Sequence, residues 1–225
     1  MSVNAPYNPL DKANLGKSVA EALIGRRAVP LDGLARFTGA GIYALYYSGR
    51  YPAYSALATR NIGGRFDAPI YVGKAIPKGG RKGAVAGPAD TDRSLHGRLA
   101  EHADSVRAAS NLDIADFHCR FLVTDEIWIP LGESLLITKF APIWNNIVDG
   151  FGNHDPGKGR HAGKRPLWDV LHPGRPWALK CAERDDTTAQ IDAQVRAFLA
   201  STPLPASTHF YVESRKAIYR VDGES

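Results

Sequence analysis

Two short apolar segments limit most strongly what this chain can fold into: residues 41–47 (GIYALYY) and residues 69–75 (PIYVGKA). Both are rich in β-branched and aromatic residues and lie beside glycine or proline, a pattern typical of buried β-strands. Residues 117–124 (FHCRFLVT) share this composition. The sequence therefore predicts a small sheet in which two strands each carry a tyrosine, Tyr43 and Tyr71.

Helical patterns surround these strands. Apolar residues recur at intervals of four from Leu15 to Leu23, which predicts an amphipathic helix over residues 12–27. The other expected helices cover residues 53–60, 92–110, 130–140 and 184–200, with a short helical piece around Leu34. Residues 149–165 have the composition of a glycine-rich basic loop, and residues 208–221 that of a terminal hairpin.

The composition is that of an ordinary globular protein. Hydrophobic residues make up 44% of the chain and charged residues 23%. No run approaches the ~18 apolar residues of a membrane span, and the first residues lack a signal-peptide pattern. Cys119 and Cys181 share no CxxC spacing, which excludes a cysteine-built zinc site. We therefore expect a cytoplasmic protein without membrane contact.

Positive charge is concentrated in two parts of the chain. Residues 41–100 carry nine Lys and Arg against three Asp and Glu, and residues 151–180 carry six against two. Residues 101–150, in contrast, carry three basic and eight acidic side chains. Runs of charge are usually solvated faces, but here the basic excess coincides with the tyrosine-bearing strands and with glycine-rich loops. This favours a polyanion as partner.

Polar residues after the strands have the types needed to hydrolyse a phosphodiester. Arg98 and His102 stand at i and i+4 of a predicted helix, so they share one face with roughly 5–6 Å between their Cβ atoms. Glu133 lies in an otherwise apolar helix, which is costly unless the carboxylate is exposed, paired or bound to metal. A lone glutamate suffices for a one-metal magnesium site. Asn145 fits a structural cap and a partner of a catalytic group equally well.

Two residues are candidates for the general base. A phenol with a pKa near 10 is only about 0.1% ionised at pH 7, a deficit of roughly 4 kcal/mol. Tyr43 would therefore need a positive neighbourhood, which Arg98, Lys74 and a metal could supply. His102 needs no such help, because an unperturbed histidine has a pKa of about 6.5. Chemistry alone ranks His102 first.

In this order the residues closely resemble the GIY-YIG nucleases. Gly41-Ile42-Tyr43 matches the first motif and Tyr71-Val72-Gly73 the second, and the resemblance spans about residues 39–146. In that family the first tyrosine is usually assigned as base, the second supports the site, the arginine contacts the scissile phosphate and the glutamate holds one divalent metal. The resemblance implies these catalytic roles for Tyr43, Tyr71, Arg98, Glu133 and Asn145, with Mg²⁺ as cofactor and Lys74 as a phosphate contact.

One branch of the family, the Type II restriction endonucleases, is the closer resemblance. His102 stands where many members have tyrosine, and a histidine is seen in that branch, which leaves Tyr43 and His102 both open as base. The segments FGNHDPGKGR and WDVLHPGRPWA also look like that branch. The resemblance implies an α/β domain with a small, mainly antiparallel central sheet flanked by helices.

The implied function is Mg²⁺-dependent cleavage of duplex DNA at a short, GC-rich palindrome by a homodimer. One alternative is a homing or repair endonuclease of the same superfamily, although such members usually carry additional modules. Another alternative is a catalytically silent DNA-binding module. Retention of every catalytic position speaks against the silent module.

This assignment predicts that the chain divides into three parts. Residues 1–38 form an N-terminal helical extension, and residues 39–148 the catalytic core with an insertion at 48–68. Residues 149–225 form a basic loop and a C-terminal extension. Base contacts are expected from the added segments, because arginine paired with guanine is the commonest specific contact. The candidate DNA-binding residues are Arg60, Arg65, Lys158 and Arg160.

Overall fold

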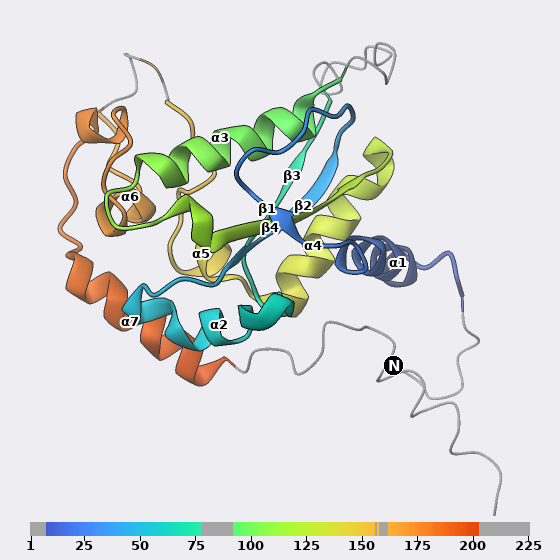
Figure 1. Ribbon diagram of the computed structural model, residues 1–225, viewed down its shortest axis with the longest axis horizontal. Helices are drawn as coiled ribbons and strands as arrows, with labels where there is room; N and C mark the ends of the chain where they lie inside the picture. The colour runs from blue at the N-terminus through green and yellow to red at the C-terminus, as the bar shows by residue number, and fades with distance from the viewer. Residues whose placement is uncertain (1–7, 78–91, 156, 158–161, 203–225) are drawn as a thin grey trace, which may run out of the picture.

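An antiparallel four-stranded sheet lies at the centre of the molecule (Figure 1). The computed structural model describes residues 8–77, 92–155, 157 and 162–202. Within these residues the strand order is β1-β4-β2-β3, and every neighbouring pair is antiparallel. The strands are β1 (Val29–Pro30), β2 (Gly41–Tyr47), β3 (Pro69–Ala75) and β4 (Phe117–Val123). The small antiparallel sheet expected from the sequence is confirmed.

Strand β2 is the central element, since all seven of its residues are buried. It pairs with β3 on one side and β4 on the other. Successive side chains of a strand point to opposite faces. The even-numbered residues from Ile42 to Tyr46 join one apolar cluster, and the odd-numbered residues from Tyr43 to Tyr47 join another. A strand buried on both faces has no polar alternation, which explains its continuous apolar run in the sequence.

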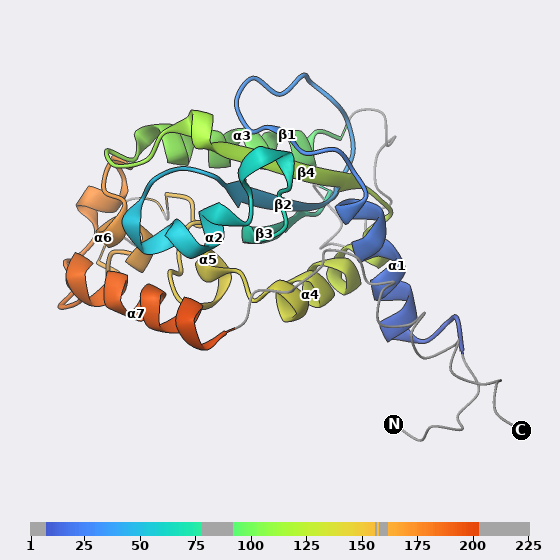
Figure 2. The same cartoon turned by 60° about the horizontal axis from the view of Figure 1, so that its bottom comes forward.

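Helices cover both faces of the sheet (Figures 1 and 2). Helices α1 and α4 pack on the face of the even-numbered β2 residues, and the other helices contribute to the cluster on the opposite face. The helices are α1 (Lys12–Ile24), α2 (Ser55–Thr59), α3 (Ser94–Ala108), α4 (Ile129–Phe140), α5 (Ile143–Asn146), α6 (Leu167–Leu171) and α7 (Thr188–Ser201). None of the helices in the described ranges is long and apolar enough to cross a membrane.

Helix α7 begins four residues later than predicted, because a capping box fixes its start. The Thr187 side chain accepts the backbone N–H of Gln190, and the Gln190 side chain accepts the backbone N–H of Thr187. Such reciprocal capping satisfies two N–H groups that the first helical turn leaves without partners. The preceding residues therefore stay outside the helix.

The short helix predicted around Leu34 is wrong. Residues 34–40 have no regular secondary structure. The chain before them instead forms the two-residue strand β1, which pairs with β4, and the Leu31 N–H donates to the Phe117 carbonyl at 3.0 Å. A strand of two residues is too short to show any periodicity. The hairpin predicted for residues 208–221 lies outside the described residues.

One side chain closes the base of the insertion between β2 and β3. Asn61 Nδ2 donates to the carbonyls of Tyr47 and Ala68, each at 2.8 Å, and Asn61 Oδ1 accepts the Ala68 N–H at 3.0 Å. Asn61 is buried, so these bonds satisfy an amide that has no access to water. The expected helix inside the insertion is confirmed as α2.

A buried polar network anchors the insertion in the core. Tyr54 Oη accepts a hydrogen bond from Trp144 Nε1 at 2.8 Å and lies 2.7 Å from His172 Nε2. His172 Nδ1 lies 2.9 Å from Asn111 Oδ1, which can only accept, so Nδ1 carries the proton. Nε2 is then free to accept from Tyr54, and burial lowers the pKa of His172 to about 3. His172 is thus a neutral structural residue.

His172 should make the free energy of unfolding depend on pH. Its pKa is about 3 in the folded chain and about 6.5 in the unfolded chain. Between these values the unfolded state binds a proton that the folded state does not. Stability is therefore complete above pH 6.5 and falls as the pH drops toward 3, by at most about 1.4 kcal/mol per pH unit for one histidine. Denaturant unfolding from pH 8 to pH 4 should show a shallower fall in His172→Gln than in the wild type. Equal slopes in both chains would contradict this assignment.

Candidate active site

The two motif tyrosines are neighbours because β2 and β3 are paired. The register places Tyr43 opposite Gly73. A Cβ on Gly73 would lie 2.4 Å from Tyr43 Oη and 3.0 Å from Tyr71 Cε1, so only glycine leaves room for both rings. The ring centroids are 6.2 Å apart. The glycine of the second motif therefore has a packing reason: it lets the two phenols approach each other.

Helix α3 brings His102 to the first tyrosine. Tyr43 Oη lies 2.6 Å from His102 Nε2, and both side chains are buried. Burial raises the pKa of Tyr43 well above its usual value, and Tyr71 adds to this while Arg98 opposes it. Burial also lowers the pKa of His102 well below its usual value, and the charge of Arg98 acts in the same direction. Both groups are therefore neutral at pH 7, and the Tyr43 hydroxyl donates to His102.

Arg98 links this buried pair to the surface, since its side chain is 19% exposed. Its Nη2 donates to the Gly152 carbonyl at 2.6 Å and its Nη1 to Glu101 at 3.2 Å, and Nη1 also contacts His154 Nε2. A Cβ on Gly152 would lie 2.7 Å from Tyr71 Oη and 3.2 Å from Arg98 Nη2. The chain after α5 therefore closes against both Tyr71 and Arg98.

Glu133 is held by an ion pair with Lys74. Lys74 Nζ lies 2.6 Å from Glu133 Oε2, and the two side chains are 36% and 18% exposed. The carboxylate that would be costly alone in an apolar helix is thus paired. Its charge also raises the pKa of Tyr71, after the larger effect of burial, so the carboxylate is close to the tyrosines. This proximity arises because β3 is an edge strand, where α3 approaches from one face and α4 from the other.

The donor set beside the tyrosines fits a metal of the magnesium type. Over the described ranges, no group of three or more His, Cys, Asp or Glu side chains is placed to hold a metal ion. A partly exposed single carboxylate, Glu133, is present instead. Mg²⁺ keeps several water ligands and often takes only one or two carboxylates together with substrate phosphate. The residues present therefore suit that cation better than a metal that requires an all-protein cage.

Asn145 binds the backbone of the second motif strand. Its Oδ1 accepts the Val72 N–H and its Nδ2 donates to the Val72 carbonyl, both at 2.8 Å. A neighbouring strand would offer the same pair of bonds to the free edge of β3. These contacts give Asn145 a structural role at the edge of β3. Its catalytic role stays a prediction.

The segment after α5 belongs to the site, although the sequence predicts only a DNA-contacting loop there. The Phe151 ring stacks on His102 with centroids 4.4 Å apart and packs edge-on to Tyr71 at 5.0 Å. His154 reaches Arg98 from the same segment. Two signals are available in the sequence: the resemblance of FGNHDPGKGR to the restriction-enzyme branch, and an aromatic residue flanked by Gly150 and Gly152, which a loop that only met solvent would not need.

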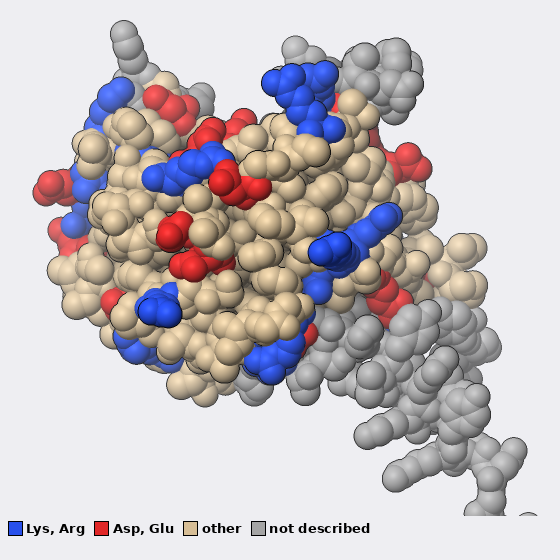
Figure 3. Space-filling view, in the orientation of Figure 1, with Lys and Arg blue, Asp and Glu red and all other residues tan. Residues whose placement is uncertain are grey.

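The structure describes two of the four candidate DNA-binding residues, Arg60 and Arg65. Arg65 is exposed and donates to the Thr59 carbonyl at 2.5 Å, and Arg60 is partly buried at the end of α2. Lys158 and Arg160 lie outside the described residues. On the face shown in Figure 3, lysines and arginines form separate groups among acidic side chains rather than one patch. Their roles in DNA contact stay predictions.

Comparison with known proteins identifies the family. The family model described as the Eco29kI GIY-YIG domain matches residues 35–199. No curated protein matches the chain. The match covers strands β2, β3 and β4, every residue of the group around Tyr43 and Tyr71, and the segment that closes over them. GIY-YIG nucleases generally use a divalent metal. The chain therefore belongs to the Eco29kI GIY-YIG domain family, a GIY-YIG nuclease family of the Type II restriction endonucleases.

Proposed function

We propose that this chain is a Mg²⁺-dependent Type II restriction endonuclease that cleaves duplex DNA at a short, GC-rich palindrome. Membership of the family supports deoxyribonuclease activity. The observation that carries the proposal is the convergence of four side chains at the β3 edge of the sheet, with the Glu133 carboxylate beside them. The four side chains are Tyr43, Tyr71, Arg98 and His102.

Arg98 is the proposed contact to the scissile phosphate. A guanidinium offers charged donors that strengthen as negative charge develops on the phosphate oxygens in the transition state. Arg98 is held by the Gly152 carbonyl and by Glu101, yet part of its side chain remains exposed. An arginine fixed in this way needs little reorganisation when DNA binds, which is the requirement for efficient electrostatic stabilisation.

Tyr43 and His102 supply a path for the proton of the attacking water. Tyr43 Oη accepts the proton from water while its own proton passes to His102 Nε2, 2.6 Å away. A phenol with a raised pKa can serve in this way without being ionised beforehand. Burial, and after it the charge of Arg98, lowers the pKa of His102. A phosphate bound at Arg98 would offset that charge, so the histidine becomes a better acceptor when DNA is bound. The two candidates for general base then act as one relay.

Glu133 is the proposed ligand of Mg²⁺, and Lys74 is the proposed phosphate contact. In the free chain Lys74 neutralises this carboxylate at 2.6 Å. A cation bound to Glu133 would take over that neutralisation and release the lysine toward the substrate. When bound, the metal supplies charge stabilisation at the phosphate oxygens.

Cleavage of both strands requires two active sites, since one chain provides a single tyrosine, arginine and histidine group. A twofold dimer places the second group in the opposite strand direction and makes the recognised sequence palindromic. Base contacts are proposed for the insertion at residues 48–68 and for residues 149–165. Arg60, Arg65, Lys158 and Arg160 offer contacts to guanine or phosphate.

Digestion of a sequenced plasmid with Mg²⁺ tests the function directly. We expect discrete fragments whose mapped ends share one short GC-rich palindrome with symmetric cuts, and a complex with cognate duplex that sediments as two chains per site. A smear of fragments or single-strand nicks by a monomer would favour the repair-type nuclease. Absence of cleavage with any divalent metal, with binding preserved, would favour the silent DNA-binding module.

Glu133→Gln should separate cleavage from DNA binding. The amide keeps the shape of the side chain but loses the charge that holds the cation. Loss of about 3 kcal/mol of transition-state stabilisation corresponds to roughly a hundredfold lower single-turnover rate. DNA affinity in Ca²⁺ should stay unchanged, because the basic surface is intact. Asp104→Asn, a carboxylate whose side chain is 77% exposed and pairs with Arg107, is the matched control and should cut normally. A near-normal rate in Glu133→Gln would remove Glu133 as the metal ligand.

Tyr43→Phe and His102→Gln test the proton path. General base catalysis contributes a factor of roughly 10²–10⁴ to a rate. Removing the Tyr43 hydroxyl should therefore lower the single-turnover rate about a thousandfold, and removing the His102 imidazole should lower it less. Burial lowers the pKa of His102, so the neutral, active form persists below pH 6.5. The acid limb of the wild-type pH–rate profile should therefore lie below pH 6.5. A greater loss in His102→Gln than in Tyr43→Phe would show that the histidine takes the proton from water itself.

A further inference from the structure

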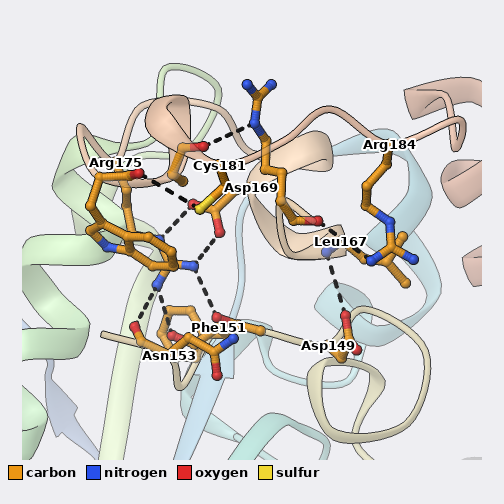
Figure 4. Close-up of polar contacts among 12 residues, drawn as sticks. Asp149, Phe151, Asn153, Leu167, Asp169, Arg175, Cys181 and Arg184 are labelled. Atoms are coloured by element: carbon orange, nitrogen blue, oxygen red, sulfur yellow. Dashed lines mark hydrogen bonds and ion pairs between the residues drawn. The ribbon is translucent and has the colours of Figure 1, made fainter. Parts of the chain in front are cut away.

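A buried arginine of the C-terminal extension binds the segment that closes the active site (Figure 4). Arg175 is 3% exposed, and its guanidinium uses all five of its N–H donors. Nε and Nη2 donate to the two oxygens of Asp169 at 2.6 and 2.5 Å. The other three N–H groups donate to the carbonyls of Gly150 at 2.9 Å, Phe151 at 3.0 Å and Asn153 at 3.1 Å. Arg175 therefore fixes the backbone of residues 150–153 at three points.

Two indole rings fix the plane of this guanidinium. Arg175 Cζ lies 4.6 Å from the centroid of the Trp168 ring and 4.7 Å from that of Trp177. Stacking on aromatic rings and a planar fork of donors are properties of arginine that lysine does not share. The geometry at residue 175 is therefore specific for a guanidinium, and a positive charge alone would not reproduce it.

The Arg175–Asp169 pair is a poor source of stability by itself. Both residues are almost completely buried, at 3% and 2% exposed. Removing two charges from water costs about as much as their attraction returns, and apolar replacements of such pairs are often neutral or stabilising. The pair does, however, hold a backbone segment that has no helical or strand hydrogen bonds of its own. The Arg175–Asp169 pair therefore matters through the function of residues 150–153, which it holds in place.

The one carbonyl in this row that Arg175 leaves out is the carbonyl that orients the active-site arginine. Gly152 O accepts from Arg98 Nη2 at 2.6 Å, between the Phe151 and Asn153 carbonyls that Arg175 holds. A shift of the segment would carry the Gly152 carbonyl with it. The position of Arg98 therefore depends on a side chain 77 residues further along the chain, in the C-terminal extension.

We propose that Arg175 is a positioning residue for DNA cleavage. It fixes the Gly152 carbonyl and thereby holds Arg98 in the orientation in which it meets the scissile phosphate. This inference rests on the proposed function, because it assigns Arg98 to that phosphate. A misplacement of about 1 Å at a reacting group can lower a rate about a hundredfold. Arg175 therefore acts on the chemical step through Arg98.

Arg175→Lys, compared with Arg184→Lys, tests the proposal. Arg184 lies in the same extension but hydrogen-bonds to Asp186 and to the Arg165 carbonyl instead, at 2.8 and 3.4 Å. We expect the single-turnover rate at saturating protein to fall about a hundredfold in Arg175→Lys and less than threefold in Arg184→Lys. The dissociation constant for DNA should change less than threefold in both variants. A folded Arg175→Lys chain with a normal single-turnover rate would overturn the proposal.

A double-mutant cycle separates positioning from a general loss of structure. In an Arg98→Ala chain there is no guanidinium left to position, so Arg175→Lys should lower the residual rate less than about twofold. Its effect on the melting temperature should be the same in both backgrounds. A hundredfold further loss in the Arg98→Ala background would show that Arg175 does not act through Arg98.

The side-chain NMR signals of arginine give a test that does not need activity. The Nε–H signal of Arg98 is identified by its loss in Arg98→Ala, and it should shift or broaden in Arg175→Lys but not in Arg184→Lys. If the wild type cuts no DNA, the proposed function fails while this signal still decides the positioning role. An unchanged Arg98 signal would overturn it. Should Arg175→Lys not fold, Trp177→Leu removes one stacking ring and is judged by the same signal and the same rate.

Discussion

The hydrogen bond between Tyr43 and His102 is the contact around which the rest of the site is arranged. Both groups are buried and polar, so each must find its partner inside the protein. The Tyr43 phenol fits beside the His102 imidazole at 2.6 Å because position 73 is a glycine, and the Phe151 ring stacks on that imidazole. Burial then drives both groups to their neutral forms, which sets the direction of the hydrogen bond. The Tyr43 hydroxyl proton therefore points toward the buried imidazole.

The edge position of β3 explains how few residues suffice around this contact. An edge strand lets side chains from both faces of a sheet come close together, and the Glu133 carboxylate is near enough to raise the pKa of Tyr71, after the larger effect of burial. It also leaves backbone groups without partners, which is a liability in an unprotected sheet. Asn145 offsets that liability by bonding to both backbone groups of Val72. The exposed edge is therefore converted into a defined part of the site.

The sequence predicts those features whose cause is local. Strands β2 and β3 follow from continuous apolar runs, and the shared face of Arg98 and His102 follows from their spacing on α3. The pairing of Glu133 is one of three outcomes that a carboxylate among aliphatic residues allows, and Lys74 provides it. These predictions need only the geometry of a single strand or helix.

The features that escape prediction arise where distant parts of the chain meet. No periodicity links Arg175 to the carbonyls of residues 150–153, because the contacts join two segments that lie on either side of α6 in the chain. The C-terminal extension therefore belongs to the site, and in the sequence only the resemblance of WDVLHPGRPWA to the restriction-enzyme branch points to it. The expected helix around Leu34 fails for the related reason that pairing of β1 with β4 decides the path of the chain there.

The side chain of Asn61 divides the insertion into two parts with different freedom to change. Its bonds to Tyr47 and Ala68 fix the path between the motif strands at the base of the insertion. Residues 62–65 beyond it are exposed, and a side chain added at Gly63 or Gly64 would meet nothing within 4 Å. Gly63 and Gly64 have φ angles of +67° and +78°, so replacing them strains the tip itself, while Asn61 still holds the chain at the base of the insertion. The exposed tip can therefore vary between related chains while the path between the motif strands is inherited unchanged.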